Sequence, residues 1–210
     1  MSFVFISGED ELTRKTLKKI IENYCPNLQI FKEFPTRGNN IFPYMKNYNK
    51  LSEKYYGFVC CDLDDESCPT NFLENLDFGD DSKNENLIIN IAVTEVENWL
   101  MSDRINFSNF LSIPPNYIPL AQETSYNRYR YEISTPVKPS LFIMNNLAPL
   151  SNNDDIINDL TPINGSKKGP AYNYQLINFV QNNWSIEEAT NNSSSLYRCV
   201  QKIIRNCQNN

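Results

Sequence analysis

Residues 57–66 read GFVCCDLDDE, a short apolar run that passes directly into a cluster of acids. An apolar run of this length, opened by a glycine, is typical of a strand buried on both faces of a parallel sheet. Ligand sites in such sheets lie beyond the carboxyl ends of the strands. Asp62 and Asp64 are two residues apart, so their side chains point the same way in an extended segment. The stretch therefore predicts a strand that delivers two carboxylates to one site.

The segments around this strand alternate between strand and helix patterns. Three more strands are predicted, at residues 3–6, 28–34 and 87–93. Helices are expected between and after them, before Pro26 and at about 41–54, 71–76 and 95–103. This alternation is typical of a mostly parallel sheet with helices on both faces. We therefore expect an α/β fold of the Rossmann-like kind.

The second half of the chain predicts a helical extension and no second domain. Prolines cluster after residue 112 and favour extended connections. Residues 140–144 fit either a strand or the start of a helix, and residues 151–169 are expected to form a polar loop. Helices are predicted at about 172–183 and 195–206, with a capping box at 185–188. The predicted organisation is one domain, with an α/β core over residues 1–112 and an extension over residues 113–210.

Net charge and hydropathy limit the partners of the protein. The 210 residues carry a formal net charge of -6. Proteins dedicated to nucleic acid are usually basic, because phosphate contacts supply most of the affinity. The chain alone is therefore expected to bind nucleic acid weakly, unless a local patch, a metal or a partner protein offsets the repulsion. No apolar run approaches the roughly 20 residues of a membrane span, and the start of the chain lacks a basic leader, so we expect a cytoplasmic protein.

The chain contains no histidine, which limits its chemistry. Ser-His-Asp and Cys-His catalysis are excluded, so reactions must rely on carboxylates, lysines, hydroxyls, thiols or a metal. Carboxylate ligands favour Mg²⁺ or Mn²⁺. The six cysteines are interpreted as free, mostly buried thiols; a zinc site is the alternative and would need a second pair of ligands.

Acids also follow two other predicted strands. Residues 9–11 come after the first strand, and Glu95 and Glu97 come after the strand at 87–93. The carboxyl ends of parallel strands share one edge of the sheet, so these acids are expected to converge with Asp62 on one cleft. Each acid taken singly also fits a solvated helix N-terminus. Together they favour a cleft that binds a divalent cation.

Four stretches in this order resemble a known family. They are Gly8 with Glu11, Asp62 and Asp64 with Cys68, Val96 to Leu100 with Asp103, and Ser193 to Leu196. The chain is similar to small bacterial TOPRIM-like proteins, related to the TOPRIM domain of nucleases of the overcoming-lysogenisation-defect type. The Glu-x-Trp-Leu stretch that starts at Glu97 is the most specific part. Ser7 stands where TOPRIM enzymes carry a general acid/base glutamate.

The resemblance implies a Mg²⁺- or Mn²⁺-dependent nuclease, a hydrolase of phosphodiester bonds. Asp62 and Asp64 would hold the metal, Glu97 would complete or support its shell, and Glu11 would act as a base or a further ligand. Proteins of this kind resemble components of bacterial antiviral defence that work beside an ABC- or AAA-type ATPase, so such a partner is expected. The alternative is a catalytically silent TOPRIM-like subunit that binds or regulates the ATPase, a reading that Ser7 favours.

Three basic residues are candidate contacts for nucleic acid. Lys167 and Lys168 lie beside Gly169 in a polar segment, and Arg14 begins a basic strip on the first predicted helix. A solvated surface is the alternative for each of them. DNA and RNA both remain open as substrates, and so does assembly into a homo-oligomer.

Overall fold

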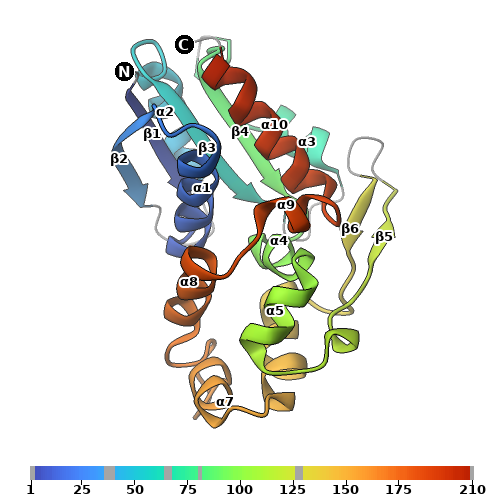
Figure 1. The fold of residues 1–210 in the computed structure, drawn as a ribbon. Helices are drawn as coiled ribbons and strands as arrows, with labels where there is room; N and C mark the ends of the chain where they lie inside the picture. Colours follow the sequence, from blue (N-terminus) through green and yellow to red (C-terminus); the bar gives the residue numbers. More distant parts are fainter. Residues whose placement is uncertain (1–2, 36–40, 64–67, 80–81, 126–129, 209–210) are drawn as a thin grey trace. The chain divides into compact units, whose positions relative to one another are not determined.

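The computed structural model describes residues 3–35, 41–63, 68–79, 82–125 and 130–208. The chain forms two compact units (Figure 1). Unit 1 comprises Met1–Ala92 and Tyr197–Asn210, and unit 2 comprises Val93–Leu196. The prediction of one domain divided near residue 112 stays a prediction.

Unit 1 is built on a parallel sheet of four strands in the order β2-β1-β3-β4. The strands are β1 (Phe3–Gly8), β2 (Gln29–Pro35), β3 (Tyr56–Asp62) and β4 (Leu87–Ala92). The middle strands β1 and β3 are almost fully buried, which explains their unbroken apolar runs. The edge strand β2 is partly exposed, in line with its alternating sequence. The predicted α/β class with a parallel, Rossmann-like sheet is confirmed.

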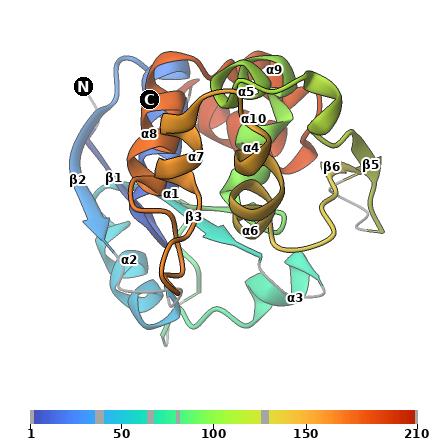
Figure 2. The same cartoon turned by 90° about the horizontal axis from the view of Figure 1, so that it is seen from below.

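Helices cover both faces of this sheet. α1 (Glu11–Tyr24) and the part of α10 (Ser194–Gln208) that belongs to unit 1 lie on one face (Figures 1 and 2). The short helix η1 (Phe42–Tyr44), α2 (Met45–Leu51) and α3 (Pro69–Glu74) lie on the other. α1 begins where the Asp10 side chain accepts a hydrogen bond of 2.8 Å from the Thr13 backbone N–H.

Unit 2 is mostly helical and contains one antiparallel pair, β5 (Ala121–Glu123) with β6 (Tyr131–Ile133). Its helices are α4 (Val96–Ser102), α5 (Arg104–Leu111), α6 (Pro139–Phe142), α7 (Asp154–Leu160), α8 (Tyr172–Asn182) and α9 (Ile186–Thr190). Shorter turns are η2 (Pro115–Tyr117), η3 (Ile143–Leu147) and η4 (Ala148–Leu150). All seven residues of α4 are buried. In the described part of the chain, no helix is long and apolar enough to cross a membrane.

In unit 2 the structure decides one prediction that the sequence left open and corrects another. Residues 140–144 are helical, in α6 and η3, so the strand alternative is wrong. The polar segment 151–169 contains α7, which the sequence analysis treated as loop. Asn153 caps this helix by accepting a hydrogen bond of 3.0 Å from the Asp155 backbone N–H. α7 buries only Ile156 and Leu160, so its apolar signal is too weak to stand out.

Two of the six cysteines form a disulfide, Cys25–Cys207, across a sequence separation of 182 residues. The interpretation of all six as free thiols is therefore wrong for this pair. Cys25 follows the last residue of α1 and Cys207 lies in the last turn of α10. No local pattern relates these positions, because the packing of two helices from opposite ends of the chain brings the sulfur atoms together.

Candidate functional site

Two acidic residues lie at the carboxyl ends of neighbouring strands in unit 1. Asp62 is the last residue of β3, and Glu9 follows the last residue of β1. The two strands run parallel in a register that pairs Gly8 with Cys60. The Glu9 carboxylate accepts a hydrogen bond of 3.2 Å from the backbone N–H of Asp62. Glu9 is only 8% exposed, so this contact is an ordered part of the structure and not a solvated turn.

The electrostatics of the adjacent thiol reflect both carboxylates. Burial raises the pKa of Cys61 well above its usual value, and the negative charges of Glu9 and Asp62 raise it further. Cys61 precedes Asp62 on β3, so the charges of both acids are felt by one thiol at the carboxyl end of this strand. Concentrated negative charge of this kind favours the binding of a cation.

Glu9, and not Glu11, is the acid that the fold brings to Asp62. Asp10 caps α1, and its carboxylate also accepts a hydrogen bond of 2.9 Å from the Thr13 hydroxyl. Glu11, the predicted base or ligand, is exposed in the first turn of α1. The sequence signal that could have separated Glu9 from Glu11 is the capping pattern that Asp10 and Thr13 form. It assigns residues 10 and 11 to the helix and leaves Glu9 at the strand end.

Ser7, which the resemblance aligns with the TOPRIM glutamate, is fully buried. Its Oγ lies 3.2 Å from the Phe34 carbonyl oxygen and 2.9 Å from the Tyr48 hydroxyl, both as hydrogen bonds. Tyr48 is itself buried, which raises its pKa. A side chain at position 7 is therefore enclosed in the core of unit 1. A proton carrier for chemistry at the strand ends must come from another residue.

Arg14 lies near the same sheet edge as Glu9. Its Nη1 donates a hydrogen bond of 3.3 Å to the carbonyl oxygen of Gly8, the last residue of β1. The predicted basic strip is otherwise partly neutralised, because Lys15 and Lys18 form ion pairs of 3.0 and 3.3 Å with Glu33. Of the predicted nucleic-acid contacts, Arg14 is the one that belongs to unit 1, together with Glu9 and Asp62.

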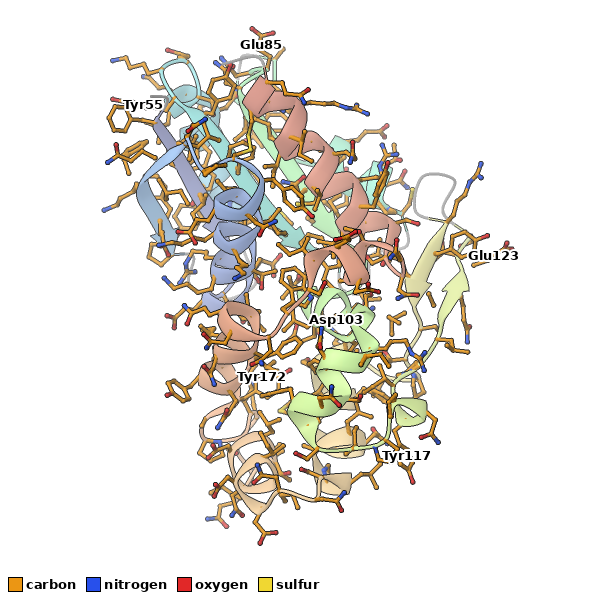
Figure 3. The ribbon with its side chains drawn as sticks, in the orientation of Figure 1. Tyr55, Glu85, Asp103, Tyr117, Glu123 and Tyr172 are labelled. Atoms are coloured by element: carbon orange, nitrogen blue, oxygen red, sulfur yellow. A yellow bond between two sulfur atoms is a disulfide. The ribbon has the colours of Figure 1, made fainter. Side chains whose placement is uncertain are left out.

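In unit 2, Glu97 and Lys168 are connected through Tyr172. Glu97 lies in the first turn of α4, is 4% exposed, and accepts a hydrogen bond of 3.0 Å from the Tyr172 hydroxyl. Tyr172 is the first residue of α8 (Figure 3). The exposed Lys168 places its Nζ 5.0 Å from the centre of the Tyr172 ring, a cation–π contact. Lys167 is also exposed. Tyr172 carries no signal in the sequence, because nothing distinguishes it from the other tyrosines of a predicted helix.

Three other buried carboxylates of unit 2 bind the starts of helices. Each accepts a hydrogen bond from a backbone N–H at or beside a helix N-terminus. A negative group at this position interacts favourably with the helix dipole and stabilises the helix. The pairs are Ser140 to Glu95 (2.7 Å), Ser185 to Asp103 (2.7 Å) and Ser195 to Glu132 (2.6 Å). One half of the predicted capping box is formed, because Ser185 Oγ accepts a hydrogen bond of 3.3 Å from the Glu188 N–H. The Ser185 N–H donates to the Asp103 carboxylate and not to the Glu188 side chain. Glu95 and Asp103 therefore have structural partners.

The donor set of the Glu9–Asp62 pair suits a hard cation. Carboxylate oxygens are the ligands that Mg²⁺ and Mn²⁺ prefer, and Glu9 and Asp62 both stand at the carboxyl ends of neighbouring parallel strands. Asp64, the second predicted ligand, lies outside the described residues. Among the residues that the structure describes, no group of three or more acids or cysteines is placed to hold a metal. Glu97 belongs to unit 2 and Asp62 to unit 1, so the convergence of these two acids stays a prediction.

No protein-family model, curated protein or solved structure matches this chain. The TOPRIM-like resemblance therefore stays a prediction from its motifs.

Proposed function

We propose that this protein is a Mg²⁺- or Mn²⁺-dependent phosphodiester hydrolase of the TOPRIM-like kind. Among the residues that the structure describes, Glu9 and Asp62 would be its metal ligands. The observation that carries the proposal is the 3.2 Å contact between the Glu9 carboxylate and the Asp62 backbone, at the ends of two adjacent parallel strands. Strand ends of this type are where α/β proteins place their ligands. Asp64 would supply a further oxygen ligand, as the resemblance implies.

Each residue near the site has a role in this proposal. The Asp62 N–H orients the Glu9 carboxylate and reduces its conformational freedom before a metal arrives. Arg14, at the end of β1, would donate hydrogen bonds to a substrate phosphate. A bound divalent cation supplies charge neutralisation at the phosphate and a more acidic water. Ser7 is enclosed by its hydrogen bonds and cannot serve as the proton acceptor. Glu9 is therefore the candidate for this role.

A partner is part of the proposed function. The net charge of -6 opposes binding to nucleic acid, so Arg14, Lys167 and Lys168 alone give weak affinity. An ABC- or AAA-type ATPase that delivers DNA or RNA would remove this limit, as expected for a cytoplasmic effector of antiviral defence. The described chain contains basic residues for such contacts in both units.

A catalytically silent subunit is the second candidate, and the enclosed Ser7 favours it. In that case the Glu9–Asp62 pair would bind a metal for structural or regulatory purposes. The two candidates share the metal and differ in whether phosphodiester bonds are cleaved.

Cleavage assays with Mn²⁺ or Mg²⁺, on single- and double-stranded DNA and RNA, separate the candidates. The wild-type protein should cleave at least one substrate, alone or with a co-purified ATPase, and Asp62→Asn should reduce the rate by two orders of magnitude or more. Glu53→Gln, an exposed acid near the end of α2, is the matched control and should retain the wild-type rate. If the wild-type protein binds Mn²⁺ but cleaves none of these substrates, the hydrolase proposal fails and the catalytically silent subunit takes its place.

A further inference from the structure

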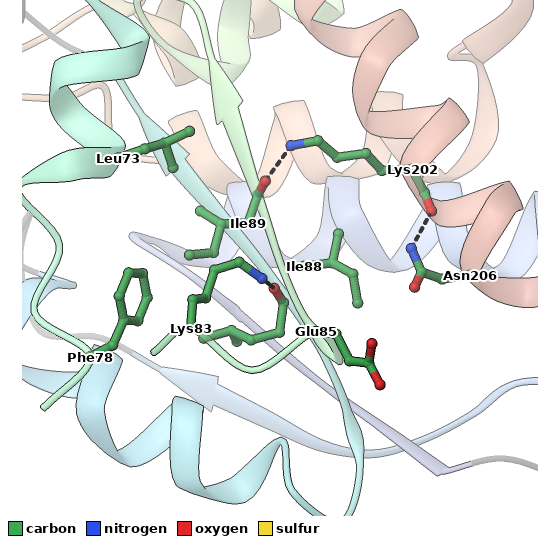
Figure 4. Close-up of a pocket in the computed structure, with 9 residues that line it drawn as sticks. Leu73, Phe78, Lys83, Glu85, Ile88, Ile89, Lys202 and Asn206 are labelled. Atoms are coloured by element: carbon green, nitrogen blue, oxygen red, sulfur yellow. Dashed lines mark hydrogen bonds between the residues drawn. The ribbon is translucent and has the colours of Figure 1, made fainter. Parts of the chain in front are cut away.

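A hollow of about 340 Å³ lies at the amino end of β4 in unit 1 (Figure 4). Leu73 of α3 and Phe78 form one apolar wall, and Ile88 of β4 forms part of another. Lys202 and Asn206 of α10 also line the hollow. Small-molecule sites are commonly concave, mostly apolar and about 300–1,000 Å³ in volume. The hollow falls at the lower end of this range.

One wall of the hollow belongs to an edge strand. β4 pairs only with β3 in the described sheet, so its other side is an open edge. The Gly57 N–H donates to the Asn86 carbonyl and the Leu63 N–H donates to the Ala92 carbonyl, each at 2.9 Å. Peptide groups alternate in direction along a strand, so the carbonyls of even-numbered residues face β3. The carbonyls of the odd-numbered residues of β4 therefore point to the open edge, where Lys83 and Lys202 donate hydrogen bonds to two of them.

Two lysines bind neighbouring carbonyls on this open edge. Lys83 Nζ donates to the Leu87 carbonyl at 2.8 Å, and Lys202 Nζ donates to the Ile89 carbonyl (Figure 4). Carbonyls two residues apart on a strand are about 7 Å from each other. The ammonium groups are thus held close enough for one ligand to reach both.

Within the described residues, the positive charges of this lysine pair are not matched by an ion-paired acid. Burial lowers the pKa of Lys202, and the positive charge of Lys83 contributes to the same shift. Burial also lowers the pKa of Lys83, an effect that Glu85 opposes. In the described part of the chain neither lysine forms an ion pair, although Glu85 also lines the hollow. An ammonium group has three N–H donors, so both lysines have capacity for an anion beside their carbonyl bonds.

We propose that the hollow binds a medium-chain monocarboxylate, with its carboxylate at Lys83 and Lys202 and its hydrocarbon chain against Leu73, Phe78 and Ile88. The site is independent of the proposed hydrolase function. Its lining on β4 ends at Ile89, whereas Asp62 pairs with Ala92 at the end of the strand, three residues or about 10 Å further along.

Two other occupants fit the geometry less well. An added peptide strand would need the outward carbonyls of β4, but Lys83 and Lys202 already bind two of them. A polyanion such as a nucleotide would need more cationic donors and would meet the charge of Glu85. A single negative charge on an apolar body matches the two ammonium groups and the apolar walls.

Calorimetric titration of the full chain with decanoate tests the proposal, with decanol as the uncharged comparison. We expect saturable binding of decanoate and at least tenfold weaker binding of decanol. Lys202→Met and Lys83→Met should each weaken decanoate binding about tenfold to a hundredfold, because each removes a charged hydrogen-bond partner. Lys202→Arg should retain most of the affinity. Lys54→Met, which removes an exposed lysine that does not line the hollow, is the matched control and should not change it.

The location of the ligand has its own readout. Decanoate should shift the methyl NMR signals of Ile88 and Ile89 more than those of Ile20, a core residue of α1. Thermal unfolding identifies any variant that fails to fold. If Lys202→Met does not fold, Lys83→Met decides the question, because Lys83 lies in the loop before β4, outside any helix or strand. Equal binding of decanoate and decanol, unchanged affinity in the folded lysine variants, no saturable binding, or capture of an acidic peptide in preference to decanoate would overturn the proposal.

Discussion

The indole Nε1 of Trp99 donates a hydrogen bond of 2.7 Å to the hydroxyl oxygen of Ser195, 96 residues further along the chain. Both residues are buried, and the two stretches that contain them are among those that carry the TOPRIM-like resemblance. The Ser195 N–H and the Ser193 hydroxyl in turn donate to the Glu132 carboxylate, at 2.6 and 2.7 Å. In unit 2 these residues form one buried hydrogen-bond network. Their identity therefore has a structural reason that does not depend on catalysis.

Ser195→Ala should destabilise the protein by about 1–3 kcal/mol, because the buried Trp99 N–H loses its acceptor. Urea unfolding measures the change. Ser194→Ala is the control: its hydroxyl accepts from the exposed Tyr131 N–H at 2.9 Å, so its removal should cost less. The double variant Trp99→Phe/Ser195→Ala should be more stable than the sum of the single effects predicts. Strict additivity would argue against the network.

Stability should fall as the pH rises from about 4.5 to 7. Burial raises the pKa of Glu132 to about 7 from its usual 4.5, so the folded state favours the protonated carboxyl. Below pH 4.5 both folded and unfolded states are protonated, and the contribution of this group is fully present. As the pH rises, the unfolded state ionises first, and about 3 kcal/mol is lost by the time the folded carboxyl has also titrated.

Glu132→Gln tests this pH dependence, because glutamine keeps a similar shape without an ionisable group. Urea unfolding between pH 4 and pH 8 should show a smaller loss of stability for the variant than for the wild type. Identical slopes would assign the pH dependence to other groups.

Loss of the Cys25–Cys207 disulfide should lower the free energy of unfolding by about 2–5 kcal/mol, because the cross-link closes a long loop of the unfolded chain. Cys207→Ser and reduction of the wild type should give similar shifts in urea unfolding, and reduction should not shift Cys207→Ser further. Cys68→Ser, which alters a free and half-buried thiol, is the control and should remain near the wild type. A wild-type midpoint that reduction leaves unchanged would contradict the role of this bond.

Glu9→Gln should weaken Mn²⁺ binding about tenfold or more, because a neutral amide is a poorer ligand than a carboxylate for a hard cation. Glu11→Gln should leave the affinity close to that of the wild type, since Glu11 is exposed on α1 while Glu9 contacts the Asp62 backbone. Calorimetry of the purified protein measures both without any need for activity. The reverse order of effects would restore Glu11 as the ligand that the sequence first suggested.

Local patterns in the sequence were sufficient for most of unit 1. β1 and β3 are predictable because strands buried on both faces leave continuous apolar runs, and α1 because its apolar residues repeat along one face. α7 was missed because a short helix that buries two side chains leaves little periodicity. The predicted end of a helix at Asp103 agrees with the end of α4. The next helix, α5, was not predicted, because it buries only Phe107, Ser108 and Leu111 and so leaves a weak apolar pattern.

The sequence by itself determined the parallel sheet, its covering helices and the position of Asp62 at the end of β3, because each depends on residues close together in the chain. Tertiary structure alone decided that Glu9 contacts Asp62, that Ser7 is enclosed beside Tyr48, that Cys25 pairs with Cys207 and that Trp99 bonds Ser195. These contacts join segments separated by 41 to 182 residues. They depend on strand order, register and helix packing, which arise only when the whole chain buries its apolar surface together.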